Sequence, residues 1–266
     1  MTFNLAFSPC PNDTFIFDAL VNQKIDTADC RFNVYLEDVQ TLNEWALAGK
    51  MDFTKVSYGV WPKISHAYQL LNSGSALGKG VGPLLITRPS ASNNQFTYST
   101  EQVNEMTIAI PGENTTAHLL FSLAYPKATK KIFKVFHEIE TAVLDGEVDA
   151  GVIIHENRFT YAAKGLIKII DLGDYWEQTY QMPIPLGGIV AKKTIAPARI
   201  HQVDAYIKQS IEYAFANYPS IAPYVRSNAQ EMSEAVMLQH INLYVNHFSF
   251  DLGTEGLAAV EKLTNI

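Results

Sequence analysis

Basic residues are scarce in this sequence of 266 residues, which has 20 Lys and Arg against 27 Asp and Glu and a formal net charge of −7. The longest basic group lies within residues 127–134 and is typical of a solvated helix face. Nucleic-acid binding requires a concentrated basic surface that neutralises phosphates. The sequence therefore predicts that nucleic acid is not a partner.

Long apolar runs are also lacking. No stretch approaches the roughly 18 apolar residues that a membrane-spanning helix needs. The apolar run at residues 3–7 has no basic segment before it and stops at Ser8-Pro9, which is too short for a signal peptide. The two cysteines, Cys10 and Cys30, fit a reducing compartment and make no disulfide framework. We therefore expect a cytoplasmic protein with no membrane association.

Metal and nucleotide motifs are missing. The sequence contains no His-Glu-x-x-His or Cys-x-x-Cys pair, and His240 and His247 have no third ligand beside them. The glycine-rich segment 78–83 lacks the phosphate-loop spacing, because Ser73 stands where the first glycine belongs and Gly80 where Ser or Thr belongs. We expect neither a metal nor a cofactor.

The segments that are present alternate between strand-like and helix-like patterns, which predicts the α/β class. With 47% hydrophobic and 18% charged residues, the chain is globular and not disordered. We expect strands over residues 3–7, 31–36, 53–56, 82–87, 106–110, 131–136, 150–154, 167–171 and 186–191. We expect helices over residues 14–21, 41–47, 116–124, 138–144, 203–216, 220–227, 233–245 and 254–263, and a polar linker over 88–101.

One short pattern occurs twice. Segments 47–52 and 144–149 both read Leu-x-Gly-x-apolar-Asp, which predicts a helix end, a glycine cap and a strand. The first strand leads to Ser57 and the second to His155. A six-residue match can arise by chance. If it is a true repeat, two α/β lobes with a cleft between them would bring Ser57 and His155 face to face.

His155 follows the buried strand at the position where open α/β sheets bind ligands. Imidazole is also the side chain best suited to exchange a proton near neutral pH. A hydrogen-bonded core histidine would show the same local pattern. Because metal and cofactor motifs are missing, proton transfer is the most economical chemistry for His155.

Three further segments are candidates for ligand binding. Residues 111–117 lead from a strand into a helix, whose free N–H groups and positive dipole end suit a carboxylate. An ordinary helix cap would have the same sequence pattern. Lys55-Val56-Ser57 offers a cation, a backbone N–H and a hydroxyl, although a lone lysine is usually a surface residue. Segment 8–15 predicts a stiff turn, capped by Asn12, Asp13 or Thr14, with an inert Cys10.

Several segments together resemble 1,4-dihydroxy-6-naphthoate synthase, an enzyme family of the futalosine route to menaquinone. They are Ser8–Phe15, Leu36–Val39, Thr54–Tyr58, Ala76–Pro83, Pro111-Gly112 with Thr115-Thr116-Ala117, and Gly151–Tyr161. The resemblance continues through Asp171–Gly173, Pro183–Gly188 and Tyr244–Asn246, so it covers nearly the whole chain.

The resemblance implies a type II periplasmic-binding-protein-like fold with two α/β lobes and a ligand cleft between them. The crossings would be Gly82–Thr87 and Leu186–Ala191, so that residues 1–88 and 190–266 form one lobe and 89–189 the other. It further implies a lyase that converts cyclic dehypoxanthine futalosine to 1,4-dihydroxy-6-naphthoate without a cofactor.

Residue by residue, the catalytic base of the resembled family matches His155. The substrate-binding residues would be Lys55, Val56, Ser57, Thr115, Thr116 and Ala117. Val56 and Ala117 would act through backbone N–H groups or shape. The expected partner is a small-molecule carboxylate substrate, and a homodimer is left open.

Three alternatives remain at this point. The first is a cytoplasmic small-carboxylate binding protein without catalysis, built on the same fold. The second is the related chorismate dehydratase, which should lack the motifs at residues 8–15 and 155–161. The third is a regulatory ligand-binding domain, although no DNA-binding segment is attached.

Overall fold

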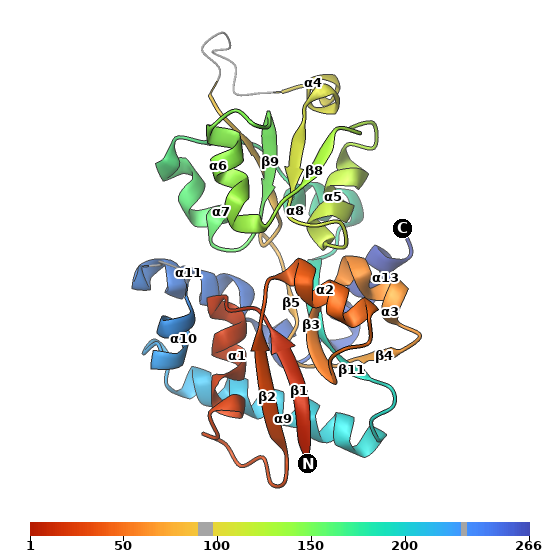
Figure 1. Ribbon diagram of the computed structural model, residues 1–266, viewed down its shortest axis with the longest axis vertical. Helices are drawn as coiled ribbons and strands as arrows, with labels where there is room; N and C mark the ends of the chain where they lie inside the picture. Colours follow the sequence, from red (N-terminus) through yellow and green to blue (C-terminus); the bar gives the residue numbers. More distant parts are fainter. Residues whose placement is uncertain (90–97, 230–232) are drawn as a thin grey trace. The chain divides into compact units, whose positions relative to one another are not determined.

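The chain folds into two compact units, both of the expected α/β class, and the computed structural model describes residues 1–89, 98–229 and 233–266 (Figure 1). Unit 1 comprises Met1–Gly78 and Pro185–Ile266, and unit 2 comprises Lys79–Ile184. The linker expected over 88–101 includes residues 90–97, which lie outside the described residues. Within the described ranges no helix combines the length and apolarity needed to cross a membrane.

These unit boundaries differ from the lobe boundaries expected at residues 88 and 189. The strand β6 (Leu84–Thr87) pairs with a strand of unit 2, so it is part of that sheet and not a crossing that belongs to unit 1. The strand β11 (Ile184–Lys192) pairs with two strands of unit 1 along its length. Backbone pairing therefore moves both boundaries toward the N-terminus.

Unit 1 is built on a sheet with strand order β2-β1-β3-β11-β4, and β5 pairs with β11. The strands are β1 (Thr2–Phe7), β2 (Arg31–Leu36), β3 (Phe53–Ser57), β4 (Tyr68–Leu70) and β5 (Ala76–Gly78), together with β11. Strand β1 runs parallel to both β2 and β3, and β11 runs antiparallel to β3. The loops after Phe7 and Ser57 therefore leave the sheet at one edge, which we call the carboxyl edge of unit 1.

Helices cover both faces of this sheet (Figure 1). They are α1 (Pro11–Val21), α2 (Val39–Leu47), η1 (Tyr58–Val60), α3 (Trp61–Ile64), α9 (Pro197–Ala216), α10 (Pro223–Asn228), α11 (Glu234–Tyr244), α12 (His247–Phe250) and α13 (Gly253–Thr264). Strand β1 shows why two faces are covered. Phe3, Leu5 and Phe7 pack into the core with α1 and α9, whereas Ala6 packs against Leu42 of α2 on the other face.

Unit 2 is built on a sheet with strand order β10-β6-β9-β7-β8. Besides β6, the strands are β7 (Ile108–Ile110), β8 (Lys131–Phe133), β9 (Ala150–Ile153) and β10 (Ile167–Asp171). Strand β7 is parallel to both β8 and β9, while β6 is antiparallel to β9 and β10. The loops after Ile110, Phe133 and Ile153 therefore share one edge, the carboxyl edge of unit 2.

The helices of unit 2 lie on both sides of its sheet. They are α4 (Thr100–Glu105), α5 (Thr116–Ala124), η2 (Phe136–Glu138), α6 (Ile139–Leu144), α7 (Asn157–Thr160), η3 (Tyr161–Lys164) and α8 (Leu172–Tyr180). Helix α6 packs against β7 and β9, and its Ile139 and Val143 enter the core of the unit. Helix α5 packs against β9 and α8.

The repeated sequence pattern corresponds to a repeated structure. In each unit a helix, α2 or α6, ends at a glycine in the left-handed region, with φ of +62° at Gly49 and +78° at Gly146. In both turns the N–H after the glycine bonds to a carbonyl in the preceding helix, as in a Schellman cap. The strand that follows, β3 or β9, lies at the centre of its sheet and leads to the carboxyl edge.

The aspartate of the repeat has the same function in both units. The Asp52 carboxylate accepts the backbone N–H of Asn4 at 2.8 Å, and Asp149 accepts that of Thr107 at 2.7 Å. Each aspartate in turn donates its own N–H to the carbonyl of the same partner. The side chain therefore fixes the entry of β3 against β1 and of β9 against β7, which makes the six-residue match a true structural repeat.

Gly188 of β11 tests how closely the strands of unit 1 are packed. A Cβ atom there would lie 2.6 Å from the hydroxyl oxygen of the fully buried Tyr58 and 2.9 Å from Cδ1 of Leu70. Overpacking of this kind costs about 1 to 3 kcal/mol. We expect Gly188→Ala to lower the midpoint of urea unfolding without changing the m-value. An unchanged midpoint would contradict this packing.

Candidate functional site

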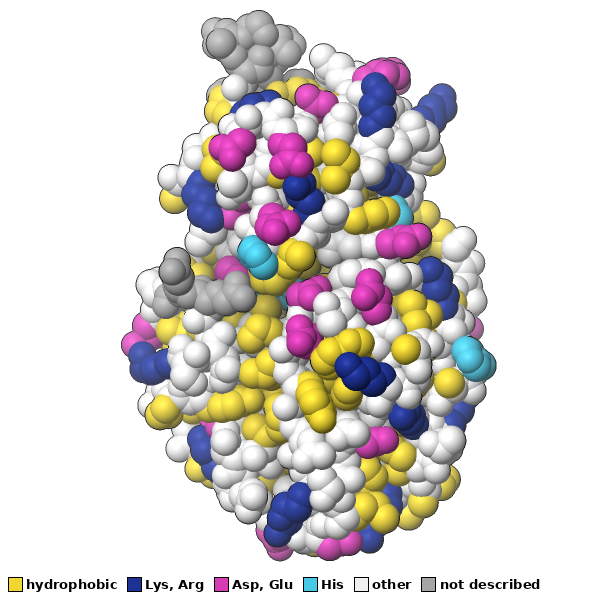
Figure 2. Space-filling model, in the orientation of Figure 1, with side chains coloured by type: hydrophobic (Ala, Val, Ile, Leu, Met, Phe, Trp, Pro, Cys, Tyr) yellow, Lys and Arg dark blue, Asp and Glu magenta, His cyan; other side chains and the backbone are white. Residues whose placement is uncertain are grey.

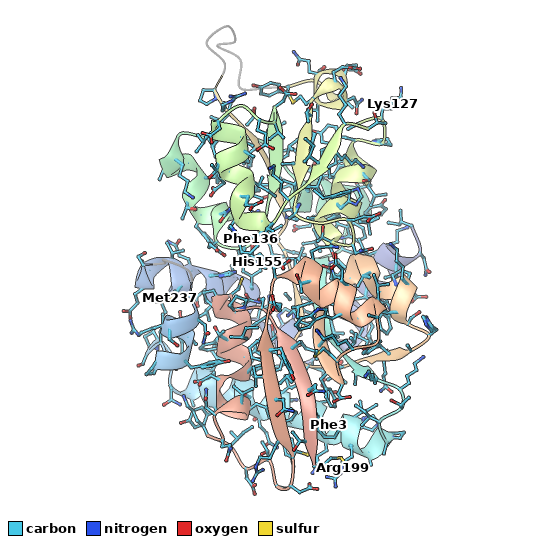
Figure 3. All side chains as sticks on the ribbon, in the orientation of Figure 1. Phe3, Lys127, Phe136, His155, Arg199 and Met237 are labelled. Carbon is cyan, nitrogen blue, oxygen red and sulfur yellow. The ribbon has the colours of Figure 1, made fainter. Side chains whose placement is uncertain are left out.

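His155 stands at the carboxyl edge of unit 2, directly after β9. Its backbone lies in the left-handed region with φ +56°, at a cost of about 1 kcal/mol for a residue other than glycine. The half-buried imidazole packs against Phe136, with ring centroids 5.1 Å apart and planes inclined by 62° (Figure 3). The loop conformation and this ring contact together place the imidazole at the edge of the sheet.

Arg158 holds the segment after His155 in place through its side-chain interactions. Its guanidinium donates to the Gly82 carbonyl and forms an ion pair of 2.6 Å with Asp171. The other oxygen of Asp171 accepts the N–H of Gly173 at 2.8 Å and so caps α8. Three segments that carry the family resemblance therefore meet in one structural network, which holds the chain next to His155.

Thr115, Thr116 and Ala117 lie at the same edge of unit 2, because β7 and β9 are parallel. Thr115 caps α5: its hydroxyl accepts the N–H of His118 at 3.1 Å and donates to the Gly112 carbonyl at 2.9 Å. Thr116 and Ala117 open the helix and are almost fully buried. The N-terminus of α5, which is the positive end of its helix dipole, therefore lies at this edge.

Lys55 lies on β3 near the carboxyl edge of unit 1. Its ammonium donates to Asp13 Oδ1 and to the Gly74 carbonyl, both at 2.9 Å. The side chains of the ion pair are only 7% and 3% exposed, so Lys55 is not a surface residue. The sequence predicted that Lys55 offers a cation to a ligand. The structure adds a buried carboxylate that already balances its charge.

Asp13 was not singled out as a site residue, and the expected caps of α1 are wrong. The N-cap is Cys10, and no side chain bonds to the helix terminus there. Asp13 instead accepts the N–H of Ser8 at 3.3 Å, the hydroxyl of Ser8 at 2.8 Å and the amide of Asn12 at 2.9 Å. Ser8, Asn12 and Asp13 therefore bond to one another at the carboxyl edge of unit 1 and do not cap the helix.

Ser57 ends β3 and is held by Asn43 of α2. The Ser57 N–H donates to Asn43 Oδ1 at 2.8 Å, and the Asn43 amide donates to Ser57 Oγ at 3.0 Å. Both side chains are buried. Because Ser57 Oγ acts as the acceptor, its own O–H can donate to a ligand. The Val56 side chain packs into the core with Val60, so any ligand contact would use its backbone.

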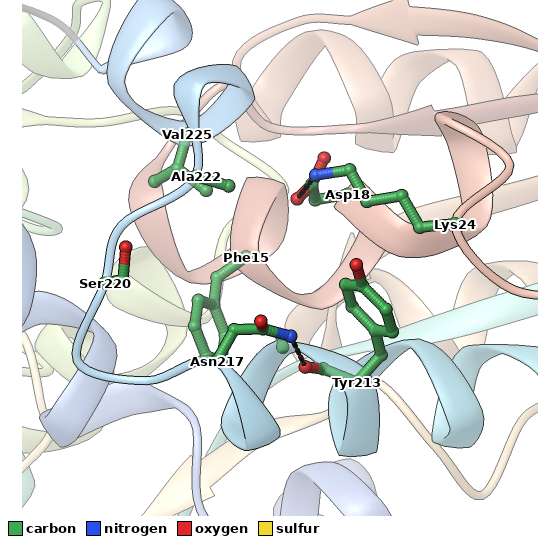
Figure 4. A pocket seen from close by; sticks show the side chains of 9 residues that line it. Phe15, Asp18, Lys24, Tyr213, Asn217, Ser220, Ala222 and Val225 are labelled. Atoms are coloured by element: carbon green, nitrogen blue, oxygen red, sulfur yellow. Dashed lines mark hydrogen bonds and ion pairs between the residues drawn. The ribbon is translucent and has the colours of Figure 1, made fainter.

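A cavity of about 150 Å³ lies in unit 1 away from these residues, between α1, α9 and α10 (Figure 4). Its walls include Phe15, Tyr213 and the ion pair of 2.6 Å between Lys24 and Asp18. Ligand pockets usually measure about 300 to 1,000 Å³. The cavity is therefore smaller than a usual ligand pocket, and it contains none of the predicted site residues.

Charged side chains on the surface do not gather into a patch of one sign on the face shown in Figure 2. On the face shown in Figure 2, acidic and basic side chains are interspersed over both units. In residues 1–89, 98–229 and 233–266, no group of three or more His, Cys, Asp or Glu could hold a metal ion. His240 is fully buried and stacks edge-on against Tyr244, as a core histidine does.

Comparison with solved structures defines the class of the protein. A protein of Archaeoglobus fulgidus superimposes with a TM-score of 0.91 at 28% identity, over 99% of this chain and 96% of that one. The periplasmic aliphatic sulphonate binding protein of Escherichia coli superimposes with a TM-score of 0.66 at 11% identity, over 99% and 85%. Together with the two α/β units, these matches assign the chain to the periplasmic-binding-protein-like fold.

Sequence comparison defines the family. The profile of the menaquinone biosynthesis family matches residues 3–266. The 1,4-dihydroxy-6-naphthoate synthase of Thermus thermophilus is 41% identical over 259 residues, which is 97% of this chain and 91% of that protein. The enzyme of the same name from Streptomyces coelicolor is 43% identical over 268 residues, 98% and 91%. The chain therefore belongs to the menaquinone biosynthesis family.

Proposed function

We propose that this protein is a carbon–carbon lyase that converts cyclic dehypoxanthine futalosine to 1,4-dihydroxy-6-naphthoate. Two relatives of that enzyme name, at 41% and 43% identity over nearly the whole chain, support the reaction. The observation that carries the chemistry is the position of His155, an imidazole at the carboxyl edge of unit 2 on the end of a central strand. We expect chorismate dehydratase to lack the motifs at residues 8–15 and 155–161, so their presence favours this reading.

In the proposed reaction His155 acts as the general base. It removes a proton from a hydroxyl of the sugar-derived part of the substrate, and the oxygen electrons form a carbonyl as the adjacent C–C bond breaks. The bond electrons pass into the bicyclic ring, whose aromatisation drives the step forward. The proton on His155 then returns to the product. Protons and electrons stay between substrate and imidazole, so the balance requires no cofactor.

Six residues would bind the substrate. On unit 2, Thr115, Thr116 and Ala117 provide the N-terminal turn of α5, where the N–H groups suit a carboxylate. On unit 1, Lys55-Val56-Ser57 provides an ammonium N–H, the strand backbone and a hydroxyl. Because Asp13 balances the charge of Lys55, we assign recognition on unit 1 to hydrogen-bond donors and not to a net positive charge.

We place the reaction in the cytoplasm, a location supported by the two buried cysteines, Cys10 and Cys30, which form no disulfide. A homodimer stays a prediction from the sequence.

Incubation of the purified protein with cyclic dehypoxanthine futalosine tests the function. We expect 1,4-dihydroxy-6-naphthoate to form in buffer with no added cofactor, at the same rate with and without EDTA. Product is followed by liquid chromatography and mass spectrometry. Recovery of tightly bound but unchanged substrate would instead indicate the binding protein without catalysis.

A further inference from the structure

The carboxylate of Asp13 joins segments that are far apart in the sequence. It accepts hydrogen bonds from Ser8 in the loop after β1, from Asn12 at the start of α1 and from Lys55 on β3. The Asp13 side chain is 3% exposed. A buried carboxylate is stable only when its charge is balanced and its oxygens are bonded, and here both conditions are met. Asp13 is therefore the centre of the polar network at the carboxyl edge of unit 1.

This network determines the direction of the Lys55 ammonium. An ammonium has three N–H donors, and a free lysine side chain samples many rotamers. Asp13 Oδ1 and the Gly74 carbonyl take two of the three donors, each at 2.9 Å. The third N–H then has a fixed direction. A donor that is oriented before the ligand arrives binds with a smaller loss of entropy.

We infer that Asp13 is a positioning residue for substrate binding, which acts through Lys55 by fixing the ammonium and balancing its charge. The inference rests on the proposed contact between the substrate and Lys55-Val56-Ser57. It goes beyond that proposal because Asp13 is not among the six proposed contact residues. A group that acts only through another should lose its effect once that other group has been removed.

A double-mutant cycle on KM tests the inference with Asp13→Asn, Lys55→Met and the double variant. Asparagine has the size of aspartate, but it carries no charge and offers a single acceptor oxygen. We expect Asp13→Asn to raise KM about tenfold or more, equivalent to about 1.4 kcal/mol, and to change kcat little. Lys55→Met should raise KM at least as much. The double variant should match Lys55→Met alone, because Asp13 has nothing left to position.

Asp18→Asn is the matched control. Asp18 lies on the same helix as Asp13, is also buried and forms an ion pair of 2.6 Å with Lys24. We expect this substitution to lower the Tm without raising KM. A merely structural role of Asp13 would give the same result at both aspartates, with a lower Tm and an unchanged KM.

Two outcomes for the Asp13 variants would overturn the inference. One is a KM for Asp13→Asn equal to that of the wild type. The other is a double variant whose KM is raised by the product of both single effects, which would mean that Asp13 acts independently of Lys55. If Asp13→Asn does not fold, Asp13→Glu replaces it in the cycle, because it keeps the charge but moves the carboxylate by one methylene. It should raise KM in the wild-type background and leave KM unchanged in the Lys55→Met background. Lys55→Met leaves the Asp13 carboxylate without its counter-ion, so its Tm is measured alongside KM. An unchanged KM for Lys55→Met overturns the inference as well, whereas product formation by the wild type tests the proposed reaction separately.

Discussion

Replacement of His155 by asparagine is expected to lower kcat by about 10² to 10⁴-fold, the usual contribution of a general base. Asparagine cannot take up a proton near neutral pH. It is also one of the few side chains that tolerate the left-handed backbone found here, at φ +56°. The loop after β9 should therefore keep its conformation while the imidazole is lost. Initial rates of 1,4-dihydroxy-6-naphthoate formation at saturating substrate measure the effect.

His201→Asn is the matched control for this variant. His201 lies on the exposed face of α9 in unit 1, so the same chemical change is made far along the chain from the proposed base. We expect wild-type kcat for His201→Asn and wild-type Tm for both variants. Near-normal turnover by His155→Asn would rule out His155 as the base.

The second large effect is expected on stability. Replacement of Arg158 by methionine should lower the free energy of unfolding by about 3 kcal/mol, because it leaves the Asp171 carboxylate buried without its counter-ion. Asp171 is 3% exposed and Arg158 is 17% exposed, so we expect the lower end of the range for buried pairs. Urea unfolding followed by circular dichroism measures the change.

Two further variants separate charge from packing at this pair. Arg199→Met removes an arginine whose ion pair with Asp29 is exposed, with side chains 33% and 53% accessible, so it should lower the free energy of unfolding much less than Arg158→Met does. The double variant Arg158→Met with Asp171→Asn removes both buried charges and should be more stable than Arg158→Met alone. Equal losses for Arg158→Met and Arg199→Met would contradict the network next to His155.

The α/β class and most elements were predictable because their apolar patterns are strong. Strand β2 and helix α5 have the expected bounds, and Gly49 and Gly146 end helices as predicted. Helix α8 was missed because its nine residues are largely polar and follow directly on β10. Strands β4 and β5 were missed because three residues are too few to show an alternation. The strand expected over 131–136 ends at Phe133, since Phe136 turns into η2 and packs against His155.

The site was only partly predictable. Strand ends in the sequence placed His155 and Ser57 at carboxyl edges, because position after a buried strand is a local signal. Asp13 and Asn43 carried no such signal. Asp13 meets Lys55 from 42 residues away, and Asn43 meets Ser57 from 14 residues away. Such pairs depend on which strands become neighbours, and the order β1-β3 in the sheet was not evident from the sequence.

The central claim, that the imidazole of His155 is the base, is tested most directly by chemical rescue of His155→Gly. Glycine adopts φ +56° without strain and leaves space where the ring was. The claim predicts that this variant binds cyclic dehypoxanthine futalosine without turning it over, and that added imidazole restores formation of 1,4-dihydroxy-6-naphthoate with a saturable dependence on imidazole concentration. A variant that turns over at the wild-type rate without imidazole, or that binds substrate and stays inactive with it, would contradict the claim.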